Sequence, residues 1–299
     1  MIARRQPGFC RLFLFGLLGV WLGACSRADD PPGLAGEWLV DLGSVDCGVT
    51  PVASFSAERD WMLFWIRHFD ADGDSGMRGP TTSPALLRFE DRRLVLPAGP
   101  ADRTGGPSFT PHRMCWDDAG DAVYVRRSGR SAYEEPHWYR AGLAVDSRLE
   151  RAGSPPQSCR EPPEVEWQWY RERVLPDALR GGLVSVKDGC CAAELRRADG
   201  VLLARHEARS RLSNQVSIGY LAWSESNRRL AYRVSEEISW WFGRPTRSFV
   251  IDQPGHPMPL DGRVYAFAWR GDHELIACAA RPRAEGGGNS LKRWRFAPP

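Results

Sequence analysis

Three aspartates, Asp70, Asp72 and Asp74, alternate with small residues near the end of the first quarter of the chain. Carboxylates at positions i, i+2 and i+4 can converge on one hard cation, and calcium prefers such oxygen ligands. Ser75 stands where a twelve-residue calcium loop requires glycine, and Thr81 stands where it requires glutamate. The segment therefore predicts either a calcium site, the one cofactor that we consider, or a solvated acidic turn.

The same segment contains Gly73-Asp74-Ser75-Gly76, a turn that could present a serine nucleophile. It resembles the nucleophile turn of chymotrypsin-like proteases, which need a histidine and an aspartate well upstream of the serine, each in its own barrel segment. His68 is the only histidine before Ser75, and at seven residues away it lies too close along the chain to serve that role. The other histidines are scattered without metal-ligand spacing, so we assign no catalytic residue.

A third group that could do chemistry is the aromatic and basic run Trp240-Trp241-Phe242-Gly243-Arg244. Consecutive residues on a strand point to opposite faces, so Trp240 and Trp241 cannot share one buried face. We expect the run to form a loop whose four large side chains bind a protein or stack on a sugar. The alternative is that these rings pack between neighbouring sheets or against the stem of their own loop.

The N-terminus has the pattern of an export signal. Three arginines, Arg4, Arg5 and Arg11, precede an apolar run of eleven residues, 12–22. That run is shorter than the 20 or so residues that a membrane span needs, but it suits a signal peptide. Its end, Leu22-Gly23-Ala24-Cys25, resembles the lipobox of bacterial lipoproteins. An ordinary secretory signal or an uncleaved anchor is the alternative.

The lipoprotein resemblance implies a processing route and a location. Residues 1–24 would form a helical signal peptide that is removed, and the Cys25 thiol and its new amine would be acylated. Several acyl chains anchor a protein firmly, because each buried methylene contributes about 0.8 kcal/mol. Ser26 at the next position implies export to the outer membrane, facing the periplasm. Residues 25–35 then read as a polar tether, and residues 36–299 as the folded domain.

Six cysteines follow Cys25, and export implies an oxidising compartment in which they can form disulfides. The candidates are Cys47, Cys115, Cys159, Cys190, Cys191 and Cys278. The sequence does not rank their pairings. On one strand Cys190 and Cys191 would face opposite sides, so we expect structural bonding by one of them. A vicinal redox pair is the alternative.

The net charge of +3 comes entirely from the three arginines of the signal segment, since no acidic residue precedes Cys25. The exported part is therefore balanced, and it has no broad positive field that would attract phosphates. We expect no nucleic acid partner. At 42% apolar and 26% charged residues, the composition is that of a globular protein.

The elements expected to position these groups are short strands separated by glycine, proline, aspartate and serine. A faint repeat recurs four times: an aromatic residue precedes a polar turn, and apolar residues follow seven and nine positions later. The four aromatic residues are Phe55, Trp116, Trp223 and Trp269. Each repeat predicts a hairpin whose first strand ends on the aromatic ring.

Additional short strands extend the hairpins to five four-stranded units that start near residues 52, 108, 165, 217 and 264. The third lacks the aromatic register, and the fifth ends after three strands. The isolated strand at residues 37–42 can supply the missing one, because pairing the two chain ends removes a free sheet edge. We expect an all-β fold, a β-propeller of about five (four to six) four-stranded blades.

The segments around Trp223 and Trp269, LAWSESNRRLAYRV and FAWRGDHELIACAA, resemble the repeats of TolB-type propellers. The Pro-Asp-Gly turn of that family is missing here. The resemblance implies a rigid ring that binds proteins, peptides or small ligands at its rims, without implying catalysis. We expect a lipid-anchored module that binds or scaffolds envelope proteins. A periplasmic inhibitor of a toxin or cell-wall hydrolase, and a propeller enzyme acting on glycans or peptides, are the alternatives.

Overall fold

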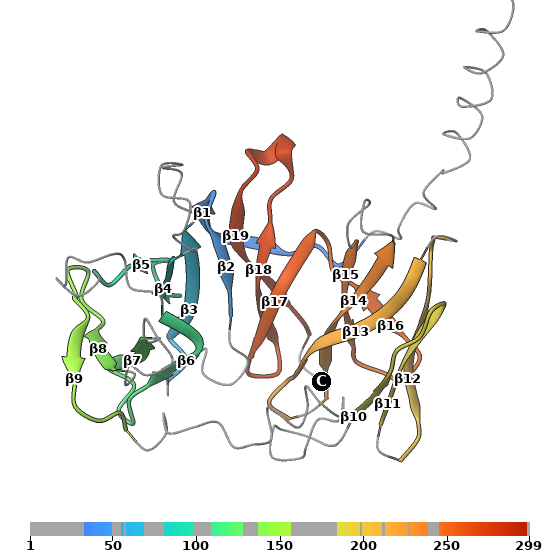
Figure 1. Ribbon diagram of the computed structural model, residues 1–299, viewed down its shortest axis with the longest axis horizontal. Coiled ribbons are helices and arrows are strands. Elements are labelled where there is room, and N and C mark those ends of the chain that lie inside the picture. The colour runs from blue at the N-terminus through green and yellow to red at the C-terminus, as the bar shows by residue number, and fades with distance from the viewer. Residues whose placement is uncertain are drawn as a thin grey trace, which may run out of the picture. The chain divides into compact units, whose positions relative to one another are not determined.

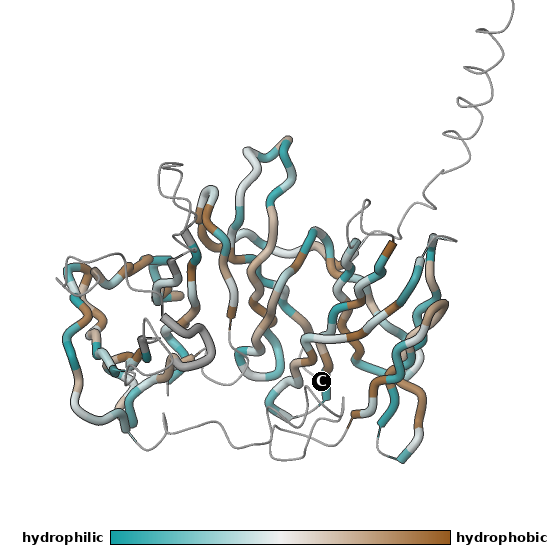
Figure 2. Tube along the Cα trace, viewed as in Figure 1, coloured by the Kyte–Doolittle hydropathy of each residue, from teal (hydrophilic) through white to brown (hydrophobic). Residues whose placement is uncertain are grey.

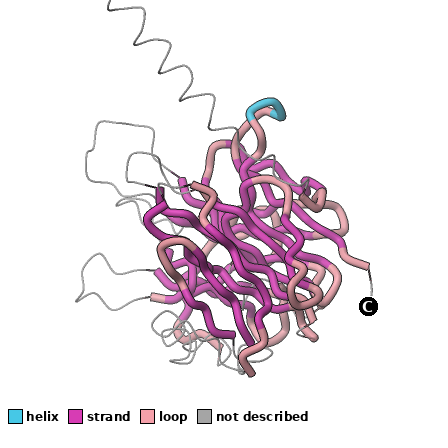
Figure 3. The backbone as a smooth tube through the Cα atoms, turned by 90° about the vertical axis from the view of Figure 1, so that its right-hand side faces the viewer, coloured by secondary structure: helices cyan, strands magenta, loops and turns pink. Residues whose placement is uncertain are grey.

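A computed structural model gives the fold of this chain, and Leu34–Pro299 forms one compact unit. The structure describes residues 33–49, 55–56, 58–68, 81–98, 109–127, 137–156, 184–197, 199–210, 213–226, 228–238 and 245–297. Nearly all regular structure in these ranges is β-strand, as Figure 3 shows, apart from the short 3-10 helix η3 (Arg283–Glu285). None of the described segments is a helix of the length and apolarity required to cross a bilayer. The expectation of an all-β fold is confirmed.

The strands form five antiparallel sheets, which we number in chain order (Figure 1). Sheet one contains β2 (Asp46–Gly48), β3 (Trp61–His68), β4 (Thr81–Arg88) and β5 (Leu94–Val95). Sheet two contains β6 (Phe109–Trp116), β7 (Ala122–Arg127), β8 (Trp138–Gly142) and β9 (Glu150–Ala152). Sheet three contains β10 (Val184–Lys187), β11 (Ala192–Arg197) and β12 (Leu202–Glu207).

Sheets four and five complete the unit. Sheet four contains β13 (Ser213–Trp223), β14 (Leu230–Ile238), β15 (Thr246–Ile251) and β16 (Pro257–Pro259). Sheet five contains β1 (Glu37–Gly43), β19 (Asn289–Arg295), β18 (Glu274–Ala280) and β17 (Arg263–Arg270), in that spatial order. The N-terminal strand therefore lies beside the C-terminal one, as expected from the sequence.

The aromatic repeat marks the hairpins because each ring closes the first strand just before a polar turn. Trp223 pairs with Leu230, and Trp116 pairs with Val123, each seven residues later. For sheet one, the repeat predicts that the first strand ends at Phe55, but Phe55 makes only an isolated bridge to Met62. The strand that pairs with β3 is β2 instead, which lies earlier in the chain.

Sheet-on-sheet packing explains why the strands carry unbroken apolar runs. Successive residues of β18 enter different cores: Leu275 packs between sheets five and four, whereas Ile276 packs between sheets five and one. A strand covered on both faces needs apolar residues at every position rather than every second one. Figure 2 shows the same distribution, with hydrophobic positions along the strands and hydrophilic ones at tips such as the β18–β19 connection.

Four hydrophobic cores join the five sheets in series. They lie between sheets two and one, one and five, five and four, and four and three. Sheets two and three share no core among the described residues, and the chain between them, residues 157–183, is outside those residues. Four junctions between the five sheets are therefore observed.

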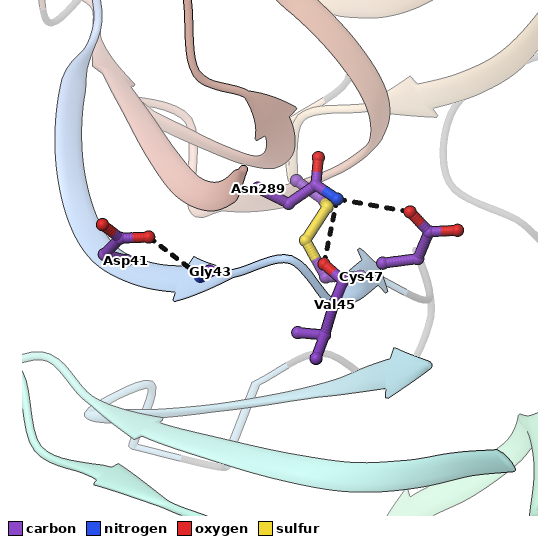
Figure 4. Close-up of a disulfide and its surroundings, with 7 residues drawn as sticks. Asp41, Gly43, Val45, Cys47 and Asn289 are labelled. Atoms are coloured by element: carbon purple, nitrogen blue, oxygen red, sulfur yellow. Dashed lines mark hydrogen bonds between the residues drawn. A yellow bond between two sulfur atoms is a disulfide. The ribbon is translucent and has the colours of Figure 1, made fainter. Parts of the chain in front are cut away.

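The junction between sheets one and five is covalently locked. Cys47 of β2 and Cys278 of β18 form a disulfide across it, with their Cα atoms 5.8 Å apart. Figure 4 shows the Asn289 side chain beside this bond, where its amide donates hydrogen bonds to the Val45 carbonyl and to the Asp46 carboxylate. Both bonded cysteines are buried in the shared core. The seam between the first and last sheets is thus held by a disulfide, hydrogen bonds and apolar packing together.

Candidate functional site

Two tyrosines occupy irregular positions on the neighbouring strands β13 and β17, which are edge strands of sheets four and five. The pairing of β13 with β14 shifts between Gly219 and Ala222, which leaves Tyr220 in a β-bulge. The pairing of β17 with β18 shifts between Val264 and Ala266, which leaves Tyr265 as the extra residue. Bulges re-aim side chains, and they occur often beside functional sites.

Tyr220 is the more unusual of the two residues. Its φ angle is 53°, in the left-handed region that a bulky side chain seldom adopts. Its side chain is 48% exposed, although most aromatic rings of this chain that the structure describes are buried or half-buried. Residues held in such conformations cost about 1–3 kcal/mol, and they cluster at functional sites. The strand thus holds a strained backbone where it displays an aromatic ring.

Two arginines complete the cluster, which we call the bulge site (Tyr220, Arg233, Arg263 and Tyr265). The Arg233 guanidinium lies over the Tyr220 ring, 3.8 Å from its centroid. The same guanidinium donates a hydrogen bond to the Tyr265 carbonyl at 3.0 Å, which joins sheet four to sheet five. Arg263 lies over the Tyr265 ring at 5.6 Å. The rings and cations are therefore held in place by each other and by the backbone.

The chemistry of the bulge site is that of recognition. Tyrosine offers a large apolar face with a polar tip, and arginine adds a planar cation that pairs with carboxylates and stacks on rings. None of these four residues forms a nucleophile–base pair. Cys278, one half of the disulfide, pairs with Ala266 beside the second bulge.

Buried polar groups elsewhere in the described residues serve the fold. His206 contacts the Tyr232 hydroxyl at 2.8 Å inside the core between sheets three and four. Burial, with smaller contributions from Arg247 and Arg209, lowers the pKa of His206 to about 4, so the ring is neutral at pH 7. Burial also raises the pKa of Tyr232. The buried pair thus bonds to itself inside the core, as buried polar groups in proteins usually do.

Several residues singled out from the sequence lie outside the described residues. They are Cys25, Asp70, Asp72, Asp74, Cys159, Trp240, Trp241, Phe242 and Arg244. Within the described ranges, no group of three histidine, cysteine, aspartate or glutamate side chains could hold a metal ion. The calcium and aromatic-loop hypotheses therefore stay predictions.

The remaining cysteines divide into bonded and free. Cys47 and Cys278 are bonded to each other, and Cys115 is disulfide-bonded as well. Cys190 and Cys191 are free, exposed thiols. Both lie in a bend before β11 begins and not on one strand, the placement that the sequence suggests, and the structure holds them unbonded.

The bulge site was not found by sequence reasoning. A bulge adds one residue to a strand without leaving a spacing signature, and Tyr220 reads as one more alternating residue of its strand. The nearest signal is Gly219, a glycine inside an apolar strand, which often marks a bulge or a close backbone approach.

Comparison with known proteins yields no family. No family model matches the sequence, and no curated protein matches it. Among solved structures, a β-fructofuranosidase from Schwanniomyces occidentalis has 9% identity and a TM-score of 0.36, covering 92% of this chain and 60% of its own. The aldose sugar dehydrogenase from Streptomyces coelicolor has 10% identity and a TM-score of 0.40, covering 88% and 99%. The AtxE2 isopeptidase has 12% identity and a TM-score of 0.41, covering 86% and 52%.

The chain spans about 60% of the length of the fructofuranosidase. With TM-scores between 0.36 and 0.41, these likenesses assign neither a fold family nor an activity.

Proposed function

We propose that this chain is a lipid-anchored β-propeller that faces the periplasm at the outer membrane and binds another envelope protein through the bulge site. The lipobox pattern that ends at Cys25 supports the anchor. Five consecutive sheets, the four junctions between them and the β1–β19 pairing support the ring. The binding role rests on the exposed tyrosine and its stacked arginine.

The ring needs one more junction, between sheets two and three. Sheet three has three strands, and its first strand, β10, begins just after residues 157–183. The alternating sequence at residues 164–170 predicts a strand there. Such a strand would give sheet three the four strands of its neighbours. Five blades would then close without a free edge.

The observation that carries the binding role is the Tyr220–Arg233 stack. Protein interfaces draw most of their affinity from a few tyrosine, tryptophan and arginine side chains that are held in place before binding. Tyr220 is exposed and fixed by a cation 3.8 Å from its ring, and the same guanidinium bonds the Tyr265 carbonyl of the next sheet. The half-buried Tyr265 side chain itself packs against the core between sheets five and one. Arginine also favours a partner surface that carries carboxylates.

The test is affinity capture of the tagged full-length chain from detergent-solubilised envelopes. Changing Tyr220 to alanine should lower recovery of the partner by about 30-fold or more, since a hot-spot residue contributes at least about 2 kcal/mol. Changing it to phenylalanine keeps the ring and should retain most of the recovery. Val145→Ala, at an exposed apolar residue in the turn between β8 and β9, is the matched control. Equal recovery by the alanine variant and the control would refute the proposed surface.

The same capture distinguishes a scaffold from an inhibitor. Several envelope proteins lost together in the alanine variant indicate a scaffold, whereas one dominant hydrolase or toxin whose activity is blocked indicates an inhibitor. Trp240→Ala combined with Trp241→Ala tests the aromatic loop separately. A large fall in thermal stability in that variant would place these rings in the core rather than at an interface.

The anchor has its own test. Cys25→Ala removes the acylated thiol, and the protein should then leave the membrane fraction for the soluble periplasmic fraction. Ser26→Asp keeps the acylated cysteine and should shift the protein from the outer to the inner membrane. Tight fractionation of Cys25→Ala with the outer membrane would contradict the lipid anchor.

A further inference from the structure

Cys190 and Cys191 are adjacent, exposed thiols in the turn between β10 and β11. Their Sγ atoms lie 2.9 Å apart. A disulfide joins two sulfurs at about 2.05 Å, so a small local adjustment would bring this pair to bonding distance. Most neighbouring cysteines on a strand would point apart, but the bend brings these two side chains together.

The turn that carries the thiols is fastened on both sides. Gly189 exchanges two backbone hydrogen bonds with Val216 of β13, at 3.4 and 2.8 Å. The Asp188 carboxylate accepts a further hydrogen bond from the backbone of β13 at 3.0 Å. Beyond the pair, the N–H of Ala208 donates to the Cys191 carbonyl at 2.7 Å. The two thiols are therefore presented to solvent on a fixed backbone.

Two kinds of chemistry suit a pair of exposed thiols: metal binding and disulfide exchange. A structural zinc ion takes four ligands. In the described part of the chain, no three histidine, cysteine, aspartate or glutamate side chains form a group that could hold a metal ion. Exchange needs only the two sulfurs and access to solvent, and both conditions are met here.

We propose that Cys190 and Cys191 form a thiol–disulfide exchange site that cycles between a dithiol and a vicinal disulfide, with an exposed disulfide of a protein or small thiol as its oxidant. One cysteine thiolate attacks a sulfur of that disulfide, forming a mixed disulfide and releasing the first thiolate. The second cysteine then attacks its neighbour, which forms the Cys190–Cys191 bond and releases the other thiolate. The two protons lost by the cysteines go to the two leaving thiolates, so the partner is reduced by two electrons.

The contact between the sulfurs lets either thiol attack first, because either Sγ could donate the hydrogen bond that joins them. Whichever cysteine forms the mixed disulfide, its neighbour lies within reach to resolve it and close the ring.

The experiment uses the full-length chain with reduced and then oxidised glutathione, followed by alkylation of free thiols and trypsin digestion. Cleavage after Lys187 and Arg196 releases Asp188–Arg196, a peptide whose only cysteines are this pair. After reduced glutathione the peptide should carry two alkyl labels. After oxidised glutathione it should carry none and be two hydrogens lighter, and renewed reduction should restore both labels. The Cys47–Cys278 bond, buried in its core, is the internal control and should stay unlabelled throughout.

Single variants test the resolving step. Cys191→Ser should accumulate a mixed disulfide with glutathione at Cys190, because the resolving thiol is gone. Cys190→Ser should accumulate the corresponding adduct at Cys191 for the same reason. Full labelling of the wild-type peptide after oxidised glutathione would overturn the proposal. Recovery of the pair bonded to another cysteine of the chain, or with two glutathiones attached, would overturn it as well.

Discussion

The disulfide across the seam between sheets one and five provides the sharpest test of the architecture. Cys47 and Cys278 are separated by 231 residues, so their bond closes nearly the whole folded unit into one loop. The chain-entropy relation for a loop of this size gives a stabilisation of about 5 kcal/mol, acting on the unfolded chain. Changing both residues to alanine should remove that contribution, and alanine avoids burying a new polar group in the core.

The assay is urea unfolding of the full-length chain, monitored by tryptophan fluorescence, without reductant. The double variant should lose about 5 kcal/mol of unfolding free energy. In a separate thermal unfolding measurement, its melting temperature should fall by about 10 °C or more. Either single variant, Cys47→Ala or Cys278→Ala, should lose nearly as much as the double variant, because both break the same bond. Losses below about 1 kcal/mol in all three variants would refute the reasoning that this bond constrains the ends of the unit.

Three further predictions concern the folded unit, each measured by urea unfolding. Lowering the pH from 7 to 4 should destabilise the fold by about 3 kcal/mol through His206, because its pKa in the fold is lowered to about 4 and the unfolded chain takes up the proton first. His206→Phe should flatten the dependence of the unfolding free energy on pH. An unchanged dependence in that variant would contradict the role of His206. Arg229→Met should cost about 2 kcal/mol, since its buried guanidinium bonds a carboxylate and two carbonyls, whereas Arg295→Met at an exposed arginine should change little. Gly288→Ala should destabilise the fold by more than about 1 kcal/mol, because φ at Gly288 is 82° and a Cβ there would lie 2.4 Å from the Gly43 carbonyl oxygen. Wild-type stability in this variant would show that the backbone around Gly288 or Gly43 moves apart at little cost.

Local patterns determined the strands. The spacing from Trp223 to Leu230 encodes a strand end, a tight turn and a strand start, and all three depend on residues close together in the chain. The pairing of β1 with β19 could also be predicted, because a three-stranded last unit would leave an edge and residues 37–42 were the one unassigned strand.

Contacts between distant segments decided the rest. Nothing near Cys47 indicates that Cys278 is its partner, because that choice depends on how sheet one packs against sheet five. The bulge that displays Tyr220 depends on the register between β13 and β14, which the residues of β13 alone do not specify. The meeting of the Cys190 and Cys191 sulfurs likewise depends on a bend that backbone hydrogen bonds to β13 hold in place. The sequence by itself therefore determined the hairpins and their order, since alternation and turns are local. The tertiary structure alone decided the disulfide, the exposed tyrosine and the meeting of the two thiols, since each depends on how separate strands are brought together.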